Sequence, residues 1–286
     1  MNSFEIKKLE PKNLPSRIKE IPDKPKQLFY KGQIPPEDYK WLAVVGSRKY
    51  SPYGREVCEK LIRGLKNYPI VIVSGLALGI DSIALETALE SKLKTVGIPG
   101  SGLDDKVLYP PASKNLAKRI IENNGCLISE FEPNQEATKW TFPQRNRIMA
   151  GLSDAVLLIE AEEKSGTMIT ARLANEYNRD VLAVPGSIFS ENTTGNHKLL
   201  KLGAGLIRSS DDIIEALDLK PEIKQEINLD DLSSLEKAIW ELLSDPKSKE
   251  EIFENLKAET SKVSSALSVL EIKGLISESL GFIRRI

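Results

Sequence analysis

Short runs of β-branched and other apolar residues alternate with longer stretches of helical periodicity between Trp41 and Leu219. Apolar positions recur every three or four residues over Tyr53–Lys66 and Ser165–Tyr177, which predicts amphipathic helices there. The apolar runs predict seven strands, namely Leu42–Val45, Ile70–Val73, Thr95–Ile98, Cys126–Ser129, Ala155–Ile159, Val181–Val184 and Gly205–Arg208. Strands that alternate with helices favour an α/β fold with a doubly wound, mostly parallel sheet.

The segments on either side of this pattern differ from it in composition. Residues 1–40 contain six prolines and nine basic residues, and we expect them to form an extended N-terminal arm laid on the domain of residues 41–219. Residues 220–232 are polar and predict a linker. Residues 233–286 show three helical patterns and two short strands about a Leu280-Gly281 turn, which favours a small C-terminal winged-helix domain.

The overall composition is typical of a soluble globular protein. The chain has 286 residues, with 40 Lys and Arg against 41 Asp and Glu, one His and two Cys. It has no apolar run of about 18 residues, the length of a membrane span. Its first residues lack the apolar core of a secretion signal. Cys58 and Cys126 lack the spacing of a zinc or redox motif. We therefore expect a cytoplasmic protein with reduced thiols and no membrane association.

Charge is distributed unevenly along the chain. Residues 1–40 carry nine basic and six acidic side chains, whereas residues 221–286 carry nine basic and thirteen acidic ones. Because neutralising phosphates requires net cations, strong non-specific duplex binding by the C-terminal domain is not expected. We expect that domain to contact a protein, with a small basic face at Lys262, Lys273 and Arg284-Arg285 as the alternative site for duplex DNA. Any other nucleic-acid site has to be a local patch.

Glycines and polar residues follow most of the predicted strands, at the edge of the sheet where open α/β folds bind ligands. Gly46-Ser47-Arg48 leads into a helix, so backbone N–H groups and the helix dipole predict an anion site, with Arg48 as a phosphate clamp. The loop matches neither GxGxxG nor GxxxxGK[ST], so it indicates neither a dinucleotide cofactor nor a P-loop nucleotidase. The alternative for Arg48 is a surface ion pair.

Two further loops have the same character. Ser74-Gly75 begins a glycine-spaced loop that opens a helix, which predicts a second anion cradle beside the first. We expect Asp81 to cap or charge the start of that helix, where the helix dipole favours a carboxylate, rather than to act as a general base. Lys164-Ser165-Gly166 follows another strand and opens a helix, which predicts a further phosphate-binding loop with Lys164 as a point charge.

A fourth cluster combines cations with aromatic rings. Residues 139–147 contain Lys139, Arg145 and Arg147 with Trp140 and Phe142, and Asn146 lies among them. Stacking rings and phosphate-binding cations are what a groove for single-stranded nucleic acid requires. The alternative is that the rings pack into the core and the arginines pair with acidic side chains.

Catalytic motifs are not evident. The chain has one histidine, His197, and no GxSxG elbow, so the sequence does not indicate nucleophilic catalysis. It also has no H-E-x-x-H motif that would indicate a metal site. We expect a binding protein without a cofactor. The predicted nucleic-acid site comprises Gly46, Ser47, Arg48, Ser74, Gly75, Lys139, Phe142, Arg145, Asn146, Arg147, Lys164, Ser165 and Gly166.

A long, ordered series of motifs between Leu14 and about Leu217 resembles the DNA-processing protein A family (DprA, also called Smf). The motifs are Val45-Gly46-Ser47-Arg48, Ser74–Asp81, Gly100–Asp104 with Tyr109-Pro110, Phe142–Ile148, Lys164–Ala171 and Val184-Pro185-Gly186-Ser187. The resemblance implies an extended Rossmann-like domain that binds single-stranded DNA, forms a homodimer and helps to load the RecA recombinase during natural transformation, without catalysis. It also implies that Gly46, Ser47 and Arg48 take a backbone phosphate, and that Lys139 and Phe142 hold and stack the strand.

Two other functions stay open from the residues. Lysine-decarboxylase-like nucleotide phosphoribohydrolases share the superfold and use a Gly-Gly-x-Gly-Thr-x-x-Glu loop. Gly166-Thr167-Met168-Ile169 is followed here by Thr170, so the expected acid/base carboxylate is missing. The third hypothesis is a sensor that binds a small phosphate ligand and acts through its winged helix.

Overall fold

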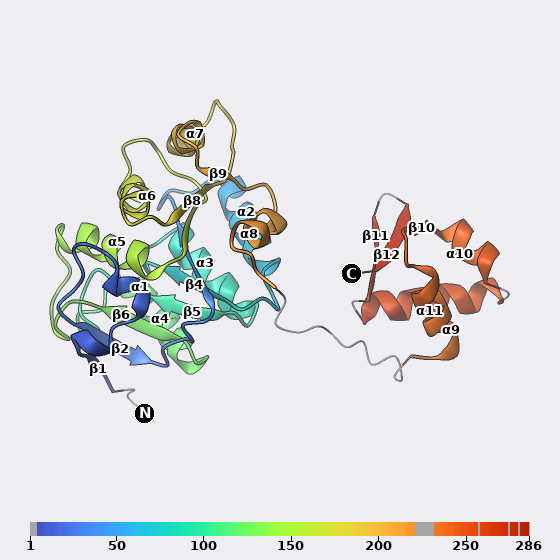
Figure 1. The fold of residues 1–286 in the computed structure, drawn as a ribbon, viewed down its shortest axis with the longest axis horizontal. Coiled ribbons are helices and arrows are strands. Elements are labelled where there is room, and N and C mark those ends of the chain that lie inside the picture. The colour runs from blue at the N-terminus through green and yellow to red at the C-terminus, as the bar shows by residue number, and fades with distance from the viewer. Residues whose placement is uncertain (1–4, 221–231, 257, 274, 280, 286) are drawn as a thin grey trace. The chain divides into compact units, whose positions relative to one another are not determined.

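The computed structural model describes residues 5–220, 232–256, 258–273, 275–279 and 281–285, and the chain divides into the compact units Met1–Glu222 and Ile223–Ile286 (Figure 1). Most of the predicted linker, residues 220–232, lies outside the described residues. We refer to the two parts as the N-terminal and the C-terminal unit. The N-terminal unit contains every residue of the predicted nucleic-acid site.

A nine-stranded sheet in the order β1-β2-β6-β5-β4-β3-β7-β8-β9 forms the centre of the N-terminal unit. The pairs from β6 through to β9 are all parallel. The strand bounds are β1 Lys7–Leu9, β2 Leu28–Gly32, β3 Lys40–Val45, β4 Ile70–Ser74, β5 Lys94–Gly97, β6 Cys126–Ser129, β7 Ala155–Leu158, β8 Asp180–Ala183 and β9 Gly205–Leu206. This arrangement confirms the predicted α/β fold with a doubly wound, mostly parallel sheet.

The last predicted strand is shorter than expected. β9 ends at Leu206 instead of Arg208, because the backbone N–H groups of Arg208 and Ser209 donate to the Asp212 carboxylate at 2.6 and 3.1 Å. Asp212 and Ser209 form a capping box that starts the next helix, so the chain leaves the sheet at this point.

The first 40 residues depart from the prediction of an arm laid on the domain. They contribute two antiparallel strands to the edge of the sheet, with β1 on β2 and β2 on β6. The Tyr30 backbone is in register with Ile128, and Leu28 and Phe29 are buried. A five-residue run between prolines gives a weak local strand signal, and its pairing depends on a partner about 100 residues later in the chain.

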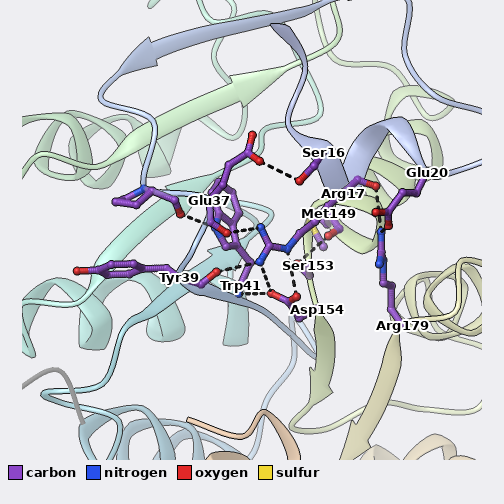
Figure 2. A network of polar contacts seen from close by, with 11 residues as sticks. Ser16, Arg17, Glu20, Glu37, Tyr39, Trp41, Met149, Ser153, Asp154 and Arg179 are labelled. Carbon is purple, nitrogen blue, oxygen red and sulfur yellow. Dashed lines mark hydrogen bonds and ion pairs between the residues drawn. The ribbon is translucent and has the colours of Figure 1, made fainter. Parts of the chain in front are cut away.

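A polar network fixes this segment to the rest of the unit (Figure 2). The Arg17 guanidinium pairs with Asp154 at 3.0 Å and donates to the carbonyl oxygens of Glu37 and Tyr39, both at 2.9 Å. The Asp154 carboxylate also accepts from the backbone N–H of Trp41 at 2.7 Å. Because Trp41 begins the buried part of β3, the network couples the N-terminal segment to the central strand.

Helices cover both faces of the sheet, as strands with alternating side-chain directions require. Ala43 and Val45 face a core that includes α1, α5 and α6, whereas Leu42 and Val44 face a core that includes α2, α3 and α8. The helix bounds are α1 Ser16–Lys19, α2 Pro52–Arg63, α3 Ile80–Glu90, α4 Lys114–Glu122, α5 Thr141–Leu152, α6 Thr167–Glu176, α7 Thr194–Lys201 and α8 Ser210–Ala216, with 3₁₀ turns at Pro11–Asn13, Pro111–Ser113 and Glu191–Thr193. Cys58 and Cys126 are free cysteines, and both are fully buried.

The C-terminal unit has its own small core around Ile239, Ile252 and Leu270. Its elements are α9 Ser234–Leu242, β10 Lys247–Ser248, α10 Lys249–Asn255, α11 Thr260–Ile272, β11 Ile276–Ser279 and β12 Phe282–Arg285, with the strands ordered β10-β12-β11. The three helices and the β11–β12 hairpin follow the predicted pattern, and β10 was not predicted. The assignment to the winged-helix class stays a prediction. None of the helices in the described part of the chain combines the length and the apolar content needed to cross a membrane.

Candidate nucleic-acid interface

The order of the strands creates one topological switch point in the N-terminal unit. From β3 the chain continues to one side through β4, β5 and β6, and later returns to pair β7 with the other side of β3. At such a point the loops after two neighbouring strands diverge and leave a crevice at their carboxyl ends. The loops after β3 and β7 are two of the three loops that the sequence predicts as anion sites.

A cavity of about 290 Å³ opens at this place, and we name it the site cavity. Its lining comes from the end of β3, the loops after β3, β4 and β7, and the helices α3, α5 and α6. The lining residues are Val45, Gly46, Ser47, Arg48, Ala77, Asp81, Phe142, Arg145, Asn146, Met149, Glu162, Ser165, Gly166, Thr167 and Thr170.

The loop after β3 presents unused hydrogen-bond donors to the site cavity. The N–H of Ser47 donates to the Glu160 carbonyl at 2.8 Å, and the Ser47 carbonyl accepts from Ile80 N–H at 3.2 Å, which fixes the loop. Among the described residues, the N–H groups of Gly46 and Arg48 have no acceptor. The Arg48 side chain is exposed and has no ion pair in the described part of the chain, so the alternative of a surface ion pair is not what the structure contains.

The start of α6 faces the same cavity from β7. Gly166 is the N-cap residue, and the N–H groups of Gly166 and Thr167 donate to no acceptor within the described residues. The Ser165 hydroxyl is buried and has no hydrogen-bond partner there. Thr167 Oγ1 donates to the Gly46 carbonyl at 3.3 Å, which joins this helix start to the loop after β3. Unused N–H groups at a helix N-terminus, beside an arginine, form a site for a phosphate.

Phe142 stands half-buried at the rim of the site cavity, in the first turn of α5. The Arg48 guanidinium carbon lies 5.5 Å from the centre of its ring, within the range of a cation–π contact. On another side, the Tyr109 ring lies 5.8 Å away at an angle of 56°. A smaller hollow of about 50 Å³ lies between these rings and Leu78, and we name it the Phe142 hollow. A cation and an aromatic platform therefore stand beside the unused donors.

Arg145 has a different position from the one predicted. It is 5% exposed, and its guanidinium donates to the carbonyl oxygens of Gly75 and of Ile98, the latter at 2.7 Å. The N–H of Gly75 donates in turn to the Asp81 carboxylate at 3.1 Å. A Cβ atom on Gly75 would clash with the Arg145 guanidinium and the Asp81 carboxylate, so a side chain there would displace these two buried groups.

Burial has the largest effect on the pKa values of Asp81 and Arg145. It raises the pKa of the Asp81 carboxyl, although Arg145 and the backbone donors oppose the shift. It also lowers the pKa of the Arg145 guanidinium, against the effect of Asp81. The predicted second anion cradle at Ser74-Gly75 is therefore occupied by protein groups, and the Ser74 hydroxyl donates to the Val44 carbonyl at 2.6 Å. Ser74, Gly75, Asp81 and Arg145 therefore hold the strand ends beside the site cavity in place.

Of the remaining predicted residues, Asn146 lines the site cavity, whereas Arg147, Lys139 and Lys164 do not. Asn146 lines the site cavity and donates to the Gly166 carbonyl at 3.4 Å. Arg147 pairs with Glu130 and donates to the Asp23 carbonyl, as the alternative hypothesis for the arginines states. Lys139 and Lys164 are exposed and do not line the cavity, and Lys139 Nζ lies 4.9 Å from the centre of the exposed Trp140 ring.

Thr167, Tyr109 and Leu78 are among the lining residues that were not in the predicted set. Thr167 follows Gly166 and belongs to the same helix start, so the sequence contained its signal. Tyr109 and Leu78 come from the loops after β5 and β4, and neither lies in a cluster of cations or aromatic residues along the chain. Only the folded sheet brings these two side chains next to Phe142.

Comparisons with known proteins agree with the resemblance seen in the motifs. Residues 6–218 match the family described as DNA recombination-mediator protein A. The chain is 44% identical over 200 residues to DNA processing protein DprA of Streptococcus pneumoniae, covering 70% of each chain. It is 38% identical over 207 residues to DNA processing protein DprA of Bacillus subtilis, covering 72% of this chain and 69% of that one.

Solved structures agree as well. The X-ray structure of DNA processing protein A from Streptococcus pneumoniae superposes with a TM-score of 0.68 at 40% identity, covering 76% of this chain and 75% of the other. A structure of DNA processing protein A from Helicobacter pylori, which concerns that protein's binding mode for single-stranded DNA, gives 0.65 at 32% identity, covering 75% and 96%. On the matching sequence and fold, this chain belongs to the DNA recombination-mediator protein A family.

Proposed function

We propose that this chain binds single-stranded DNA at the site cavity and catalyses no reaction on it. The observation that carries the proposal is the convergence of unused N–H groups, the Ser165 hydroxyl and Arg48 beside the half-buried ring of Phe142. The donors suit a backbone phosphate, and the ring suits a stacked base. One nucleotide of a single strand offers both groups at once.

The relatives support a role in DNA processing and recombination. Two of them are named DNA processing proteins, and the Helicobacter pylori structure concerns single-stranded DNA. The finer parts of the proposal come from the family resemblance: a cytoplasmic homodimer that protects incoming strands and loads RecA onto them in natural transformation. The C-terminal unit then contacts a protein or duplex DNA.

The enzyme hypothesis has less support. Thr170 is buried in the lining of the site cavity, at the loop position where the phosphoribohydrolases carry their glutamate. Glu162 also lines the cavity, but it is exposed. Competition between AMP and oligo-dT therefore distinguishes a nucleotide enzyme from a protein that binds single-stranded DNA.

Arg48→Ala tests the proposal through the salt dependence of binding. We expect about fivefold weaker binding of labelled oligo-dT, corresponding to an exposed ion pair of about 1 kcal/mol. The slope of log K against log salt should fall by about 0.7, the value for one lost phosphate contact on a single strand. Fluorescence anisotropy over a salt series measures both quantities.

The matched control is Arg172→Ala. Arg172 is exposed on α6, pairs with Glu176 at 3.5 Å and lies outside the site cavity, so its loss should change neither quantity. The proposed function is supported if oligo-dT binds tightly and if duplex DNA and AMP are only weak competitors for the same site. Absent binding, or displacement by micromolar AMP, would instead favour a nucleotide enzyme or sensor.

A further inference from the structure

We propose that the bound strand continues past Phe142 into a second subsite, formed by Tyr50, Arg55 and Leu78, which holds at least one more nucleotide. The inference rests on the proposed function, because it extends the same strand. Its evidence lies in a different part of the surface, at the start of α2 and the loop before α3.

The first line of evidence is a row of adjacent depressions. The site cavity and the Phe142 hollow share Arg48, Ala77, Phe142 and Arg145. The Phe142 hollow shares Leu78 with a third depression of about 220 Å³, which we name the Tyr50 hollow. The Tyr50 hollow is lined by Tyr50, Arg55, Leu78, Gly79, Ser82, Ile83, Glu86, Ala112, Ser113 and Leu116.

The loop between these hollows is held against the phosphate site. Gly79 has a φ of +89°, and a Cβ atom there would lie 2.5 Å from the Ser47 carbonyl oxygen and 2.7 Å from the Arg48 Cα. This close approach places the neighbouring Leu78 beside the backbone of Arg48. A strand with a phosphate at Arg48 therefore meets Leu78 next.

The second line of evidence is the chemistry of the exposed side chains. Tyr50 is 37% and Leu78 51% exposed, although both are large and apolar enough to be buried. The Arg55 guanidinium carbon lies 5.8 Å from the centre of the Tyr50 ring. The Tyr50 hollow thus repeats the pairing of an arginine with an aromatic ring seen at Arg48 and Phe142. Aromatic platforms with arginine are a recurring means of holding successive bases of a single strand.

The acidic side chain in the Tyr50 hollow limits what binds there. Glu86 lines the hollow and has no ion pair within the described residues. Its carboxylate repels a phosphate but accepts a hydrogen bond from a thymine N3–H or from an exocyclic amino group. We therefore place a base against Tyr50 and Glu86, and its phosphate on the side of Arg55, whose own partner Glu59 lies at 3.2 Å.

The experiment compares oligo-dT lengths from 4 to 12 nucleotides, within the span of about 4–16 typical of such sites. Affinities of the full chain are measured by anisotropy for the wild type, Tyr50→Leu, Arg55→Ala and Arg172→Ala. Arg172→Ala is matched to Arg55→Ala because both arginines are exposed and pair with a glutamate one helical turn later. Thermal melting of each variant verifies that the fold is intact.

The wild type should gain affinity with length until both subsites are filled. Tyr50→Leu and Arg55→Ala should bind the shortest oligomer like the wild type but lose fivefold or more for the longest, whereas Arg172→Ala should match the wild type throughout. Wild-type affinity of both variants at every length overturns the second subsite and leaves the proposed function standing. An equal loss at every length also overturns it as a separate subsite. If the wild type binds no oligomer, the proposed function fails, and the subsite with it.

Discussion

Arg145→Ala is expected to lower the free energy of unfolding of the N-terminal unit by about 3–5 kcal/mol, the cost of removing one partner from a buried charged group. The guanidinium bridges the Gly75 and Ile98 carbonyls at the ends of β4 and β5. Its removal leaves both acceptors buried and unpaired, and Asp81 loses its stabilising cation. Urea unfolding followed by circular dichroism should show a lower midpoint at unchanged slope.

The same variant separates a scaffold role from a binding role. The control Arg172→Ala removes an exposed ion pair and should change the unfolding free energy by less than about 0.5 kcal/mol. If Arg145→Ala instead unfolds like the wild type and reduces the salt slope of DNA binding, then Arg145 is a phosphate ligand after all. In that case the hydrogen bonds to Gly75 and Ile98 contribute little.

Phe142→Ala is expected to weaken binding of single-stranded DNA by about 1–3 kcal/mol, which is roughly five- to 150-fold, if one base stacks on its ring. The change also removes the cation–π contact that orients Arg48, so part of the loss should appear as a coupling between the two side chains. Anisotropy with Arg48→Ala, Phe142→Ala and the double variant measures this coupling as a double-mutant cycle.

Phe142→Trp and Phe142→Leu provide the matched comparison. The tryptophan keeps a π-face and should retain most of the affinity, whereas the leucine keeps apolar volume and should not. Affinity of Phe142→Leu equal to that of the wild type would mean that the ring packs against Tyr109 and serves the fold alone. Melting curves of all variants distinguish lost stacking from lost structure.

The sequence predicted the central fold because its signal is local. Buried parallel strands are apolar on both faces, so residues 70–73 and 155–158 form continuous β-branched or aliphatic runs. β1 and β10 were missed because they contain only three and two residues. β2 has five residues and was missed because its run between prolines gives a weak local signal, so that it becomes a strand through its pairing with β1 and β6. Their formation is a property of the assembled sheet.

Part of the candidate site was predicted, and the sequence did not show which of its arginines are buried. Glycine-rich strand ends indicated Gly46-Ser47-Arg48 and Ser165-Gly166 as phosphate-binding residues, and these residues do line the site cavity. Their binding of nucleic acid stays a prediction. Arg145 and Arg147 carry the same guanidinium as Arg48, and a guanidinium suits a phosphate, a carbonyl group or a carboxylate equally well. Whether it faces solvent or the strand ends depends on how α5 packs, which the residue pattern does not specify.

The pairing of β3 with β7 has a consequence for biosynthesis. Val45 and Leu158 are neighbours in the sheet, yet about half of the unit is translated between them. A nascent chain that has emerged as far as Ser153 contains Gly46-Ser47-Arg48 and Phe142 but lacks the strand that closes the crevice and the helix start that completes it. The proposed capacity to hold a strand of DNA should therefore arise late and abruptly during synthesis, so that truncated chains are released without it.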